Sequence, residues 1–362
     1  MGALLASVLI VAAFWWPSFL GSPPASAAST RPTIVPKGCQ RSPAADIAAL
    51  PAGATWVGQG CYNLTGSEIL ITKPVTIDGG TFYDNSADRD IQPLIRIKWT
   101  DHVTVENVTL VGSNNPFCNP FPGCMYHSDL VNGAGIDVLN SSDLVFQNIV
   151  TMDTWGDGMT LFGLPRHGQD TNILINGLTV VTAGRCGFAP TTVANLVVQH
   201  LHVESSATPA IDFESDLPTT GITGPVSIAN STWVGGLFYQ EFGTPLYGPD
   251  VVTFTNDLAI GTLHVGGVGV QLVQFIGGGF QVPSQVHGVY VAAIEDGVSS
   301  QTNPGHGLPL VFNGVTFTRT PDGPVTAPGW AADNGSRVVF NESLVPPPVG
   351  TADPSSRVWV NP

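Results

Sequence analysis

The sequence predicts an all-β chain that folds as a right-handed parallel β-helix, a solenoid wound from a single chain, with a short helix capping its N-terminal end. The composition supports this class. It has 42 glycines and 30 prolines that interrupt short runs of valine, isoleucine, threonine and phenylalanine, and long helical patterns are missing. An internal repeat supports it more specifically, since one phrase, apolar-x-apolar-x-Asn/Gly-x-Thr/Val, recurs at intervals of roughly 21 to 30 residues.

Each copy of the repeat predicts two short strands joined at a corner, because Asn and Gly tolerate the left-handed backbone that a corner requires. The copies occupy residues 75–81, 103–109, 144–150, 173–179, 196–202, 226–232, 252–256, 310–316 and 338–342. The interval before the copy at 310–316 is long, and one or two degenerate copies are predicted within it, around Val270-Gln271-Leu272. One turn cannot bury its apolar face alone, so we expect successive turns to stack about 4.8 Å apart.

Stacking of this kind places equivalent residues in columns. The inward column is predicted to contain Val105, Phe146, Ile175, Val198 and Ile228, and the corner column Asn107 and Asn148. The handedness follows from the preference of parallel strands for right-handed connections. A β-sandwich or a propeller would instead need many two-residue hairpin turns, which do not dominate this sequence.

The two ends of the chain differ from the repeats. Residues 1–28 are predicted to be a signal peptide, because an apolar stretch precedes the small residues Ala25-Ser26-Ala27; an uncleaved membrane anchor is the alternative, although prolines break the apolar run. Residues 29–54 are predicted as a leader and a cap, with a short helix within residues 42–51 that covers the open edge of the solenoid. The β-helix is predicted over residues 55–345, and an irregular tail over residues 346–362.

Charge and cysteine content indicate the compartment and exclude some partners. The net charge is −15 and the chain has three lysines, so no basic patch is available for nucleic acid or an anionic membrane. A secreted protein without membrane contact after signal cleavage is expected. The five cysteines suit this compartment, and Cys39 with Cys61 and Cys118 with Cys124 are predicted disulfides. Cys186 is left over as a small core residue or, alternatively, a reactive thiol.

A second phrase aligns across four rungs, between the copies of the repeat. It reads Gly135-Ile136-Asp137, Gly158-Met159-Thr160, Gly187-Phe188-Ala189 and Ala210-Ile211-Asp212. The alternation of a strand predicts an inward column of Ile136, Met159, Phe188 and Ile211 and an outward column of Asp137, Thr160, Ala189 and Asp212. Carboxylates in such a row need water, a cation or an arginine to compensate them.

Arg185 comes one rung before the acidic strand that contains Asp212 and Glu214. Its guanidinium is suited to neutralise these carboxylates, to lower their pKa and to bind an acidic sugar group bidentately. The candidate catalytic residues are Asp157, Arg185, Asp212 and Glu214, and the candidate substrate-binding residues are Asp137, Asp153 and Trp155. The alternative is an exposed cluster with a surface ion pair of little weight. Asp212, Glu214 and Asp216 also offer oxygen ligands suited to Ca²⁺, although no cofactor is required by the sequence.

The repeats over residues 70–345 resemble those of the pectin-lyase-like right-handed parallel β-helix proteins. More narrowly, Gly156-Asp157-Gly158, Arg185-Cys186-Gly187 and Ala210-Ile211-Asp212-Phe213-Glu214 resemble three successive rungs of a bacterial secreted subgroup, with Ala210 in place of a glycine. The resemblance implies this fold, which hosts lyases, hydrolases, epimerases, esterases, adhesins and phage spikes. The rungs do not carry the complete motif set of polygalacturonase-like hydrolases, because Arg96-Ile97-Lys98 comes too early.

The leading interpretation is therefore a secreted carbohydrate-active protein that cleaves or modifies a polysaccharide on the outer face of consecutive rungs. Glycoside hydrolysis needs two carboxylates about 5–9.5 Å apart. A lyase or an epimerase needs a neutralised uronate and a base. The second interpretation is a non-catalytic cell-surface or adhesive solenoid that binds carbohydrate. The sequence leaves open whether the protein is a monomer or a trimer.

Overall fold

The computed structural model describes residues 36–84, 92–114, 132–164, 168–214, 222–241, 251–261, 263–267, 272–282, 294–297, 310–319, 330–333, 337–342, 350–352 and 357–361. The chain divides into two units, residues 1–31 and residues 32–362. The first unit, which contains the predicted signal peptide, lies outside the described residues. Among the described residues, no helix is long and apolar enough to cross a membrane.

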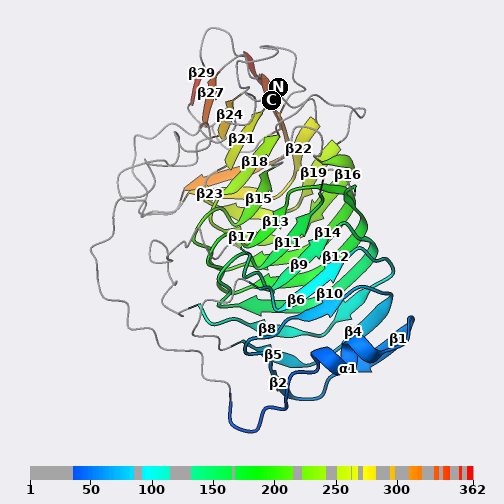
Figure 1. Cartoon of the computed structure of the whole chain (residues 1–362). Coiled ribbons are helices and arrows are strands. Elements are labelled where there is room, and N and C mark those ends of the chain that lie inside the picture. The colour runs from blue at the N-terminus through cyan, green and yellow to red at the C-terminus, as the bar shows by residue number, and fades with distance from the viewer. Residues whose placement is uncertain are drawn as a thin grey trace, which may run out of the picture. The chain divides into compact units, whose positions relative to one another are not determined.

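The second unit is a parallel β-helix, as the repeats predict (Figure 1). One sheet has eleven described strands, which stack in chain order. They are β3 (Ile69–Ile71), β6 (Ile95–Lys98), β9 (Ile136–Leu139), β11 (Met159–Phe162), β13 (Phe188–Pro190), β15 (Ile211–Glu214), β18 (Leu237–Glu241), β21 (Leu263–Gly267), β24 (Ile294–Gly297), β27 (Trp330–Asp333) and β29 (Gly350–Ala352). We call it the eleven-stranded sheet.

The other strands form a sheet with nineteen described members. They are β1 (Ala54–Val57), β2 (Cys61–Asn63), β4 (Val75–Asp78), β5 (Thr81–Tyr83), β7 (Thr104–Glu106), β8 (Thr109–Val111), β10 (Ser142–Met152), β12 (Asp170–Val180), β14 (Val193–Val203), β16 (Thr223–Ala229), β17 (Thr232–Val234), β19 (Val251–Thr255), β20 (Leu258–Ile260), β22 (Leu272–Ile276), β23 (Gly279–Val282), β25 (Leu310–Asn313), β26 (Thr316–Arg319), β28 (Arg337–Asn341) and β30 (Arg357–Asn361). The pairs β10–β12 and β12–β14 are parallel, as are β9–β11 and β11–β13 in the eleven-stranded sheet.

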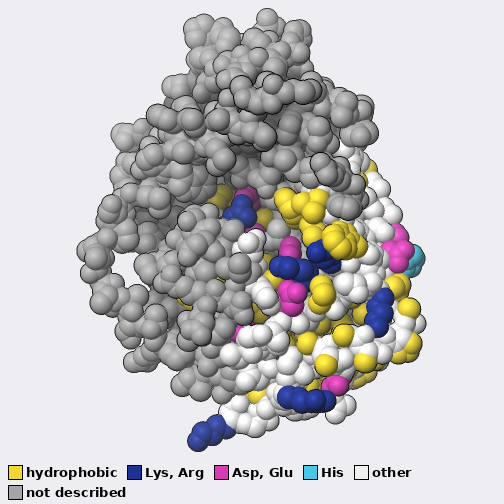
Figure 2. Space-filling view, viewed as in Figure 1, with side chains coloured by type: hydrophobic (Ala, Val, Ile, Leu, Met, Phe, Trp, Pro, Cys, Tyr) yellow, Lys and Arg dark blue, Asp and Glu magenta, His cyan; other side chains and the backbone are white. Residues whose placement is uncertain are grey.

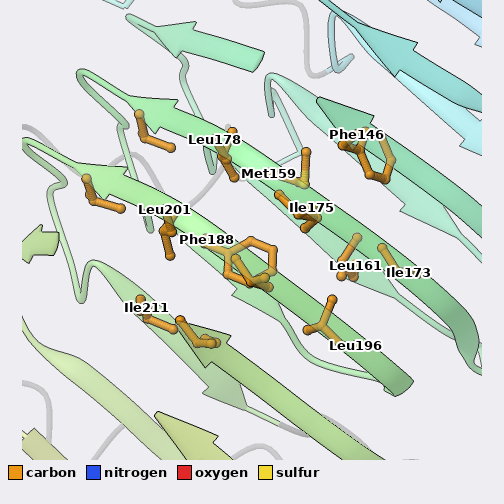
Figure 3. Packing of buried hydrophobic residues seen from close by; sticks show 14 of the residues in the cluster. Phe146, Met159, Leu161, Ile173, Ile175, Leu178, Phe188, Leu196, Leu201 and Ile211 are labelled. Atoms are coloured by element: carbon orange, nitrogen blue, oxygen red, sulfur yellow. The ribbon is translucent and has the colours of Figure 1, made fainter. Parts of the chain in front are cut away.

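The predicted inward column is confirmed by the register. Phe146 pairs with Val105 on one side and with Ile175 on the other, and the column continues through Val198 and Ile228. These side chains are buried, and fully burying one apolar side chain contributes about 1.5–3 kcal/mol. Figure 3 shows Phe146 and Ile175 in this core, with Met159, Phe188 and Ile211 from the eleven-stranded sheet.

The column continues as a stack of phenylalanine rings toward the C-terminus. The ring centroids of Phe254 and Phe275 lie 4.6 Å apart, those of Phe275 and Phe312 5.1 Å, and those of Phe312 and Phe340 5.0 Å. A degenerate copy exists in this interval, but it begins at Val273, three residues later than predicted, because Val273 pairs with Val252 and Phe275 with Phe254.

The predicted corners adopt the left-handed backbone. The corner column has positive φ at Gly79, Asn107, Asn148, Gly177, His200, Asn230 and Asn256. Asn148 Nδ2 donates a hydrogen bond to Asn107 Oδ1 (3.1 Å), and Asn107 Nδ2 donates one to Asp78 Oδ1 (2.8 Å). The repeat does not reveal a second corner column with the same geometry, which contains His102, Asp143, Asn172, Asn195 and Gly224.

The N-terminal cap is confirmed in outline. Helix α1 (Ala44–Ala49) buries Ile47 and packs against β3. A disulfide joins Cys39 to Cys61 of β2, as predicted, and Gln40 forms a parallel bridge with Tyr62. The leader is thereby fastened to the first rung.

The irregular tail predicted for residues 346–362 needs correction. Strands β29 and β30 lie within it, and Asn361 Nδ2 of β30 donates a hydrogen bond to Asn341 Oδ1 of β28 (2.7 Å). The prolines at 346–348 hide the pattern, but Val358 and Val360 pair with Val338 and Phe340 and continue the stack.

Candidate functional site

The candidate site lies on the outer face of the eleven-stranded sheet, where four consecutive rungs align as predicted. Ile136, Met159 and Phe188 form the inward column, and Phe188 pairs with Ile211 of the next rung. On the opposite face, Thr160 pairs with Asp137 before it and with Ala189 after it. This outer face is not uniformly open, because Asp137 and Thr160 are half-buried whereas Ala189 and Asp212 are buried.

Glycines let these rungs approach one another closely. A Cβ atom at Gly158 would lie 2.5 Å from the carbonyl oxygen of Gly187, and one at Gly187 would lie 2.7 Å from that of Ala210. No larger residue fits either position without moving the backbone. The column ends at Ala210, where the resemblance expected another glycine, and this alanine is buried.

Arg185 connects the two aspartates on which the site depends. Its Nη1 atom lies 3.4 Å from Asp157 Oδ2, and its Nη2 atom lies 3.5 Å from Asp212 Oδ2. The side chains of Asp157 and Asp212 are 1% and 6% exposed, whereas that of Arg185 is 24% exposed. Two carboxylates buried at this depth need a cation, and the always-charged guanidinium supplies it.

Stacked turns place Arg185 between these carboxylates. The turns pair through backbone hydrogen bonds from Gly156 N to Gly133 O (2.9 Å), from Arg185 N to Gly156 O (3.1 Å) and from Thr208 N to Arg185 O (3.1 Å). Arg185 therefore lies between the turn before Asp157 and the turn before Asp212. Arg185 lies one rung before the acidic strand because from there its guanidinium contacts the carboxylates of both Asp157 and Asp212.

Asp157 is held by two further groups of the protein besides Arg185. Its Oδ1 atom accepts a hydrogen bond from the backbone N–H of Cys186 (2.8 Å), and its Oδ2 atom accepts one from the Thr160 hydroxyl (2.8 Å) in addition to the arginine. Such a fixed carboxylate is positioned to orient Arg185 and the Cys186 turn.

Cys186 links both carboxylates. Its thiol donates a hydrogen bond to Asp212 Oδ2 (3.3 Å) and contacts Thr208 Oγ1 (3.1 Å). Burial, together with the charges of Asp212 and Asp157, raises the pKa of the Cys186 thiol well above its ordinary value. A reactive cysteine needs a lowered pKa and access, so the environment favours the small buried residue over the reactive thiol.

A second ion pair joins Arg96 to Asp137, the residue that precedes Thr160 by one rung. Arg96 Nε donates a hydrogen bond to Asp137 Oδ2 (3.0 Å) and lies 3.7 Å from Glu68 Oε2. Burial raises the pKa of Asp137, the Arg96 guanidinium opposes that shift, and the nearby Asp157 adds to it. The cluster thus contains the carboxylates of Glu68, Asp137, Asp157 and Asp212 and the guanidinium groups of Arg96 and Arg185. Figure 2 shows acidic and basic side chains gathered on this face, with hydrophobic side chains beside them.

The two remaining substrate-binding candidates lie in the corner after β10. Asp153 Oδ1 accepts a hydrogen bond from the Thr182 hydroxyl (2.6 Å), and burial raises the pKa of Asp153. Trp155 is half-buried and donates a hydrogen bond from Nε1 to Ser113 Oγ (2.9 Å). This hydrogen bond fixes the orientation of the indole ring, which limits its freedom to stack on a sugar.

The Glu214 side chain, Asp216, Cys118 and Cys124 lie outside the described residues, so the predicted calcium ligands and the second disulfide stay predictions. Within the described ranges, no group of three or more His, Cys, Asp or Glu side chains has an arrangement that could hold a metal ion.

The sequence interpretation missed Arg96 and Glu68 as members of the cluster. A signal for Arg96 was present, because Ile95-Arg96-Ile97 has the same alternation as Ile136-Asp137-Val138 and pairs with it in register. The second phrase therefore extends over one more rung than the four predicted, and Arg96 precedes its partner Asp137 by 41 residues.

Comparison with known proteins defines the fold and no more. No protein-family model and no curated protein matches the sequence. The catalytic domain of a GH87 α-1,3-glucanase in complex with nigerose is similar over 93% of this chain and 69% of that chain, with 11% identity and a TM-score of 0.51. The receptor-binding protein of bacteriophage Det7, a podoviral tailspike in a myovirus, aligns over 84% of this chain and 73% of that chain, with 10% identity and a TM-score of 0.27.

The glucanase similarity agrees with a parallel β-helix, and the tailspike alignment is too poor to carry any conclusion. The resemblance to pectin-lyase-like proteins is thus supported at the level of the fold, while the bacterial subgroup stays a prediction.

Proposed function

We propose that the protein is a secreted carbohydrate-active enzyme that cleaves or modifies a polysaccharide along the outer face of the eleven-stranded sheet. The observation that carries the proposal is the Arg185 guanidinium, which bridges the buried carboxylates of Asp157 and Asp212 beside the more exposed Asp137. General acid catalysis is favoured by a proton donor whose pKa is raised toward the working pH, and burial raises the pKa of Asp137.

Asp137 is the proposed proton donor. Its side chain is 22% exposed, against 6% for Asp212, so it is the more accessible of the two. Burial raises its pKa, which keeps it protonated to a higher pH than an ordinary aspartic acid. This role replaces the substrate-binding role that the sequence suggested for Asp137.

Asp212 and Arg185 are the proposed partners of this acid. Asp212 supplies a further carboxylate on the same face, and Arg185 orients a hydroxyl or acidic group of the sugar. Asp157 acts through Arg185, because its oxygens are already engaged by the protein. Asp137 and Asp212 lie three rungs apart, roughly 14 Å at about 4.8 Å per rung, whereas the two acids of a glycoside hydrolase lie about 5–9.5 Å apart. The proposal therefore covers hydrolysis, elimination and epimerisation alike.

A calcium ion at Asp212, Glu214 and Asp216 is a separate proposal. Arg185 already provides a positive charge beside Asp212, which disfavours a second cation at the same oxygen. A chelator such as EDTA is therefore expected to leave the activity unchanged. Loss of activity on addition of EDTA would support the calcium site.

The test is the digestion of neutral and uronic polysaccharides by the secreted protein, with α-1,3-glucan as the first substrate because of the glucanase similarity. Asp137→Asn and Asp212→Asn are expected to lower kcat by about 10²–10⁴. An activity that needs protonated Asp137 falls as the pH rises through the pKa of that group, and the Asn variant should lose this limb of the pH profile.

The matched controls are Asp46→Asn and Arg41→Gln. Arg41 and Asp46 form an ion pair of 3.3 Å at an exposed position near α1, so the same substitutions there should leave the activity unchanged. Products from none of the polysaccharides, or full activity in Asp137→Asn and Asp212→Asn, would refute the proposal.

The second candidate function is a non-catalytic solenoid that binds carbohydrate. The deep burial of Asp157, at 1% exposure, and its bonds to Thr160 and Cys186 favour it, because a purely structural ion pair has these features. It predicts that a polysaccharide of the panel binds and is recovered uncleaved.

A further inference from the structure

Trp99 comes directly after strand β6, at an unusual place for a large aromatic residue. Its side chain is 55% exposed, so core packing does not explain it. Its φ angle is +52°, a left-handed conformation that bulky residues rarely adopt and that costs of the order of 1–3 kcal/mol.

The next rung shows which residue suits this corner. Trp99 N donates a hydrogen bond to Leu139 O (3.0 Å), and Lys98 pairs with Leu139, so Asn140 occupies the position equivalent to Trp99. Asn140 has a φ of +48°, and asparagine tolerates this conformation well. Tryptophan thus occupies a corner at which asparagine is the less strained residue, and burial does not offset the strain.

Lys98 lies over the exposed ring. Its Nζ atom is 3.9 Å from the centroid of the Trp99 ring, which is the geometry of a cation–π interaction. In the part of the chain that the structure describes, no carboxylate forms an ion pair with Lys98. A lysine without an acidic partner is notable in a chain with net charge −15 and three lysines.

The pair adjoins the candidate site. Lys98 and Arg96 alternate with buried Ile95 and Ile97 and therefore share the outer face of β6. Arg96 is bonded to Asp137, the proposed acid. The register continues the Lys98 column through Leu139 to Phe162, both half-buried, so apolar surface extends from the ring along the charged cluster.

We infer that Trp99 and Lys98 form a binding subsite for an acidic sugar unit, a uronate, of the polysaccharide. The inference rests on the proposed function in that the ligand is a carbohydrate. The exposed face of the indole ring receives the apolar face of the sugar ring. A sugar suits an aromatic side chain because it has C–H groups on its face and polar groups at its edge. The Lys98 ammonium binds the carboxylate of the same sugar unit, and the two contacts together select an acidic over a neutral sugar.

Isothermal titration of the full-length secreted protein with oligogalacturonate, oligomannuronate and a neutral nigero-oligosaccharide tests the inference. The variant is Trp99→Asn, which places the better-tolerated residue at this corner and is expected to fold at least as stably as the parent. It should weaken binding of a uronate probe about tenfold. Lys98→Gln should weaken the uronate probe by a similar factor and leave the affinity for the neutral probe unchanged.

Matched controls are Trp359→Asn, at another exposed tryptophan, and Lys37→Gln, at an exposed lysine. Both should bind as the parent does. Unchanged uronate affinity in Trp99→Asn, or no binding of either uronate probe to the parent, would overturn the subsite.

The two proposals fail in different ways. If Asp137→Asn abolishes turnover while Trp99→Asn binds normally, the subsite fails and the proposed function stands. If Trp99→Asn weakens uronate binding while Asp137→Asn keeps full turnover, the subsite stands and the proposed catalytic roles fail.

Discussion

At the scale of single residues, Arg185 neutralises two carboxylates that neighbouring rungs bury. Asp157 and Asp212 come from different turns of the solenoid, and each is bonded to one nitrogen of the same guanidinium. An ion pair of this kind differs from an exposed one, because removal of the cation leaves two charges in a poorly solvated place.

Arg185→Ala is therefore expected to lower the free energy of unfolding by about 3–5 kcal/mol. Arg41→Ala, which removes the exposed partner of Asp46, should lower it by about 1 kcal/mol or less. Chemical denaturation of both variants measures the difference. Equal effects would mean that the Arg185 pair is solvated like a surface pair.

At the scale of one structural element, the corner column links each turn to the next. Asn148 adopts a φ of +51° in the middle of β10 and bonds to Asn107 of the rung before. Gly177, at φ +83°, occupies the equivalent corner of the next rung. A residue at this corner can therefore adopt the left-handed backbone without making the side-chain hydrogen bond that asparagine makes.

Asn148→Ala should lower the free energy of unfolding by about 1–2 kcal/mol, because it loses the hydrogen bond and keeps a strained backbone. Asn148→Gly loses the same bond but relieves the strain, so its loss should be smaller. Denaturation curves of the two variants separate the contribution of the hydrogen bond from that of the backbone strain. A glycine variant less stable than the alanine variant would show that backbone strain does not govern this corner.

At the scale of the whole molecule, stability depends on acids that folding buries. Burial raises the pKa of Asp257 to about 7, from an ordinary value of 3.8, although hydrogen bonds from Ser231 oppose the shift. Burial also raises the pKa of Asp170 well above its ordinary value. The folded protein therefore binds protons that the unfolded chain releases between about pH 4 and pH 7.

This difference in bound protons makes the stability depend on pH. Because the folded state binds more protons over this range, stability is greatest below the unfolded pKa and falls as the pH rises toward about 7. Asp257→Asn keeps an oxygen for the Ser231 N–H and cannot ionise, so its Tm relative to the parent should increase from pH 4 to pH 8. Thermal melts across this range test it, and a difference that is constant with pH would contradict the assignment to Asp257.

The repeat and its local consequences can be derived from the amino-acid sequence without a structure. The stacked rungs, the inward column from Val105 to Ile228, the left-handed corners and the Cys39–Cys61 bridge result from alternation, from the tolerance of Asn and Gly, and from stacking. The sequence also predicts that Arg185 lies one rung before Asp212. Most of these features recur along the chain, so their period reveals them.

The chemistry of the site, in contrast, depends on contacts that only the folded chain makes. Folding buries Asp157 and Asp212 instead of leaving them on a solvated face, joins Arg96 to Asp137 across 41 residues of sequence, and sets Trp99 in a strained, exposed corner. The physical reason is that alternation determines which face of a strand a side chain occupies. It does not determine which groups lie over that face, and pKa, access and ion pairing depend on that covering.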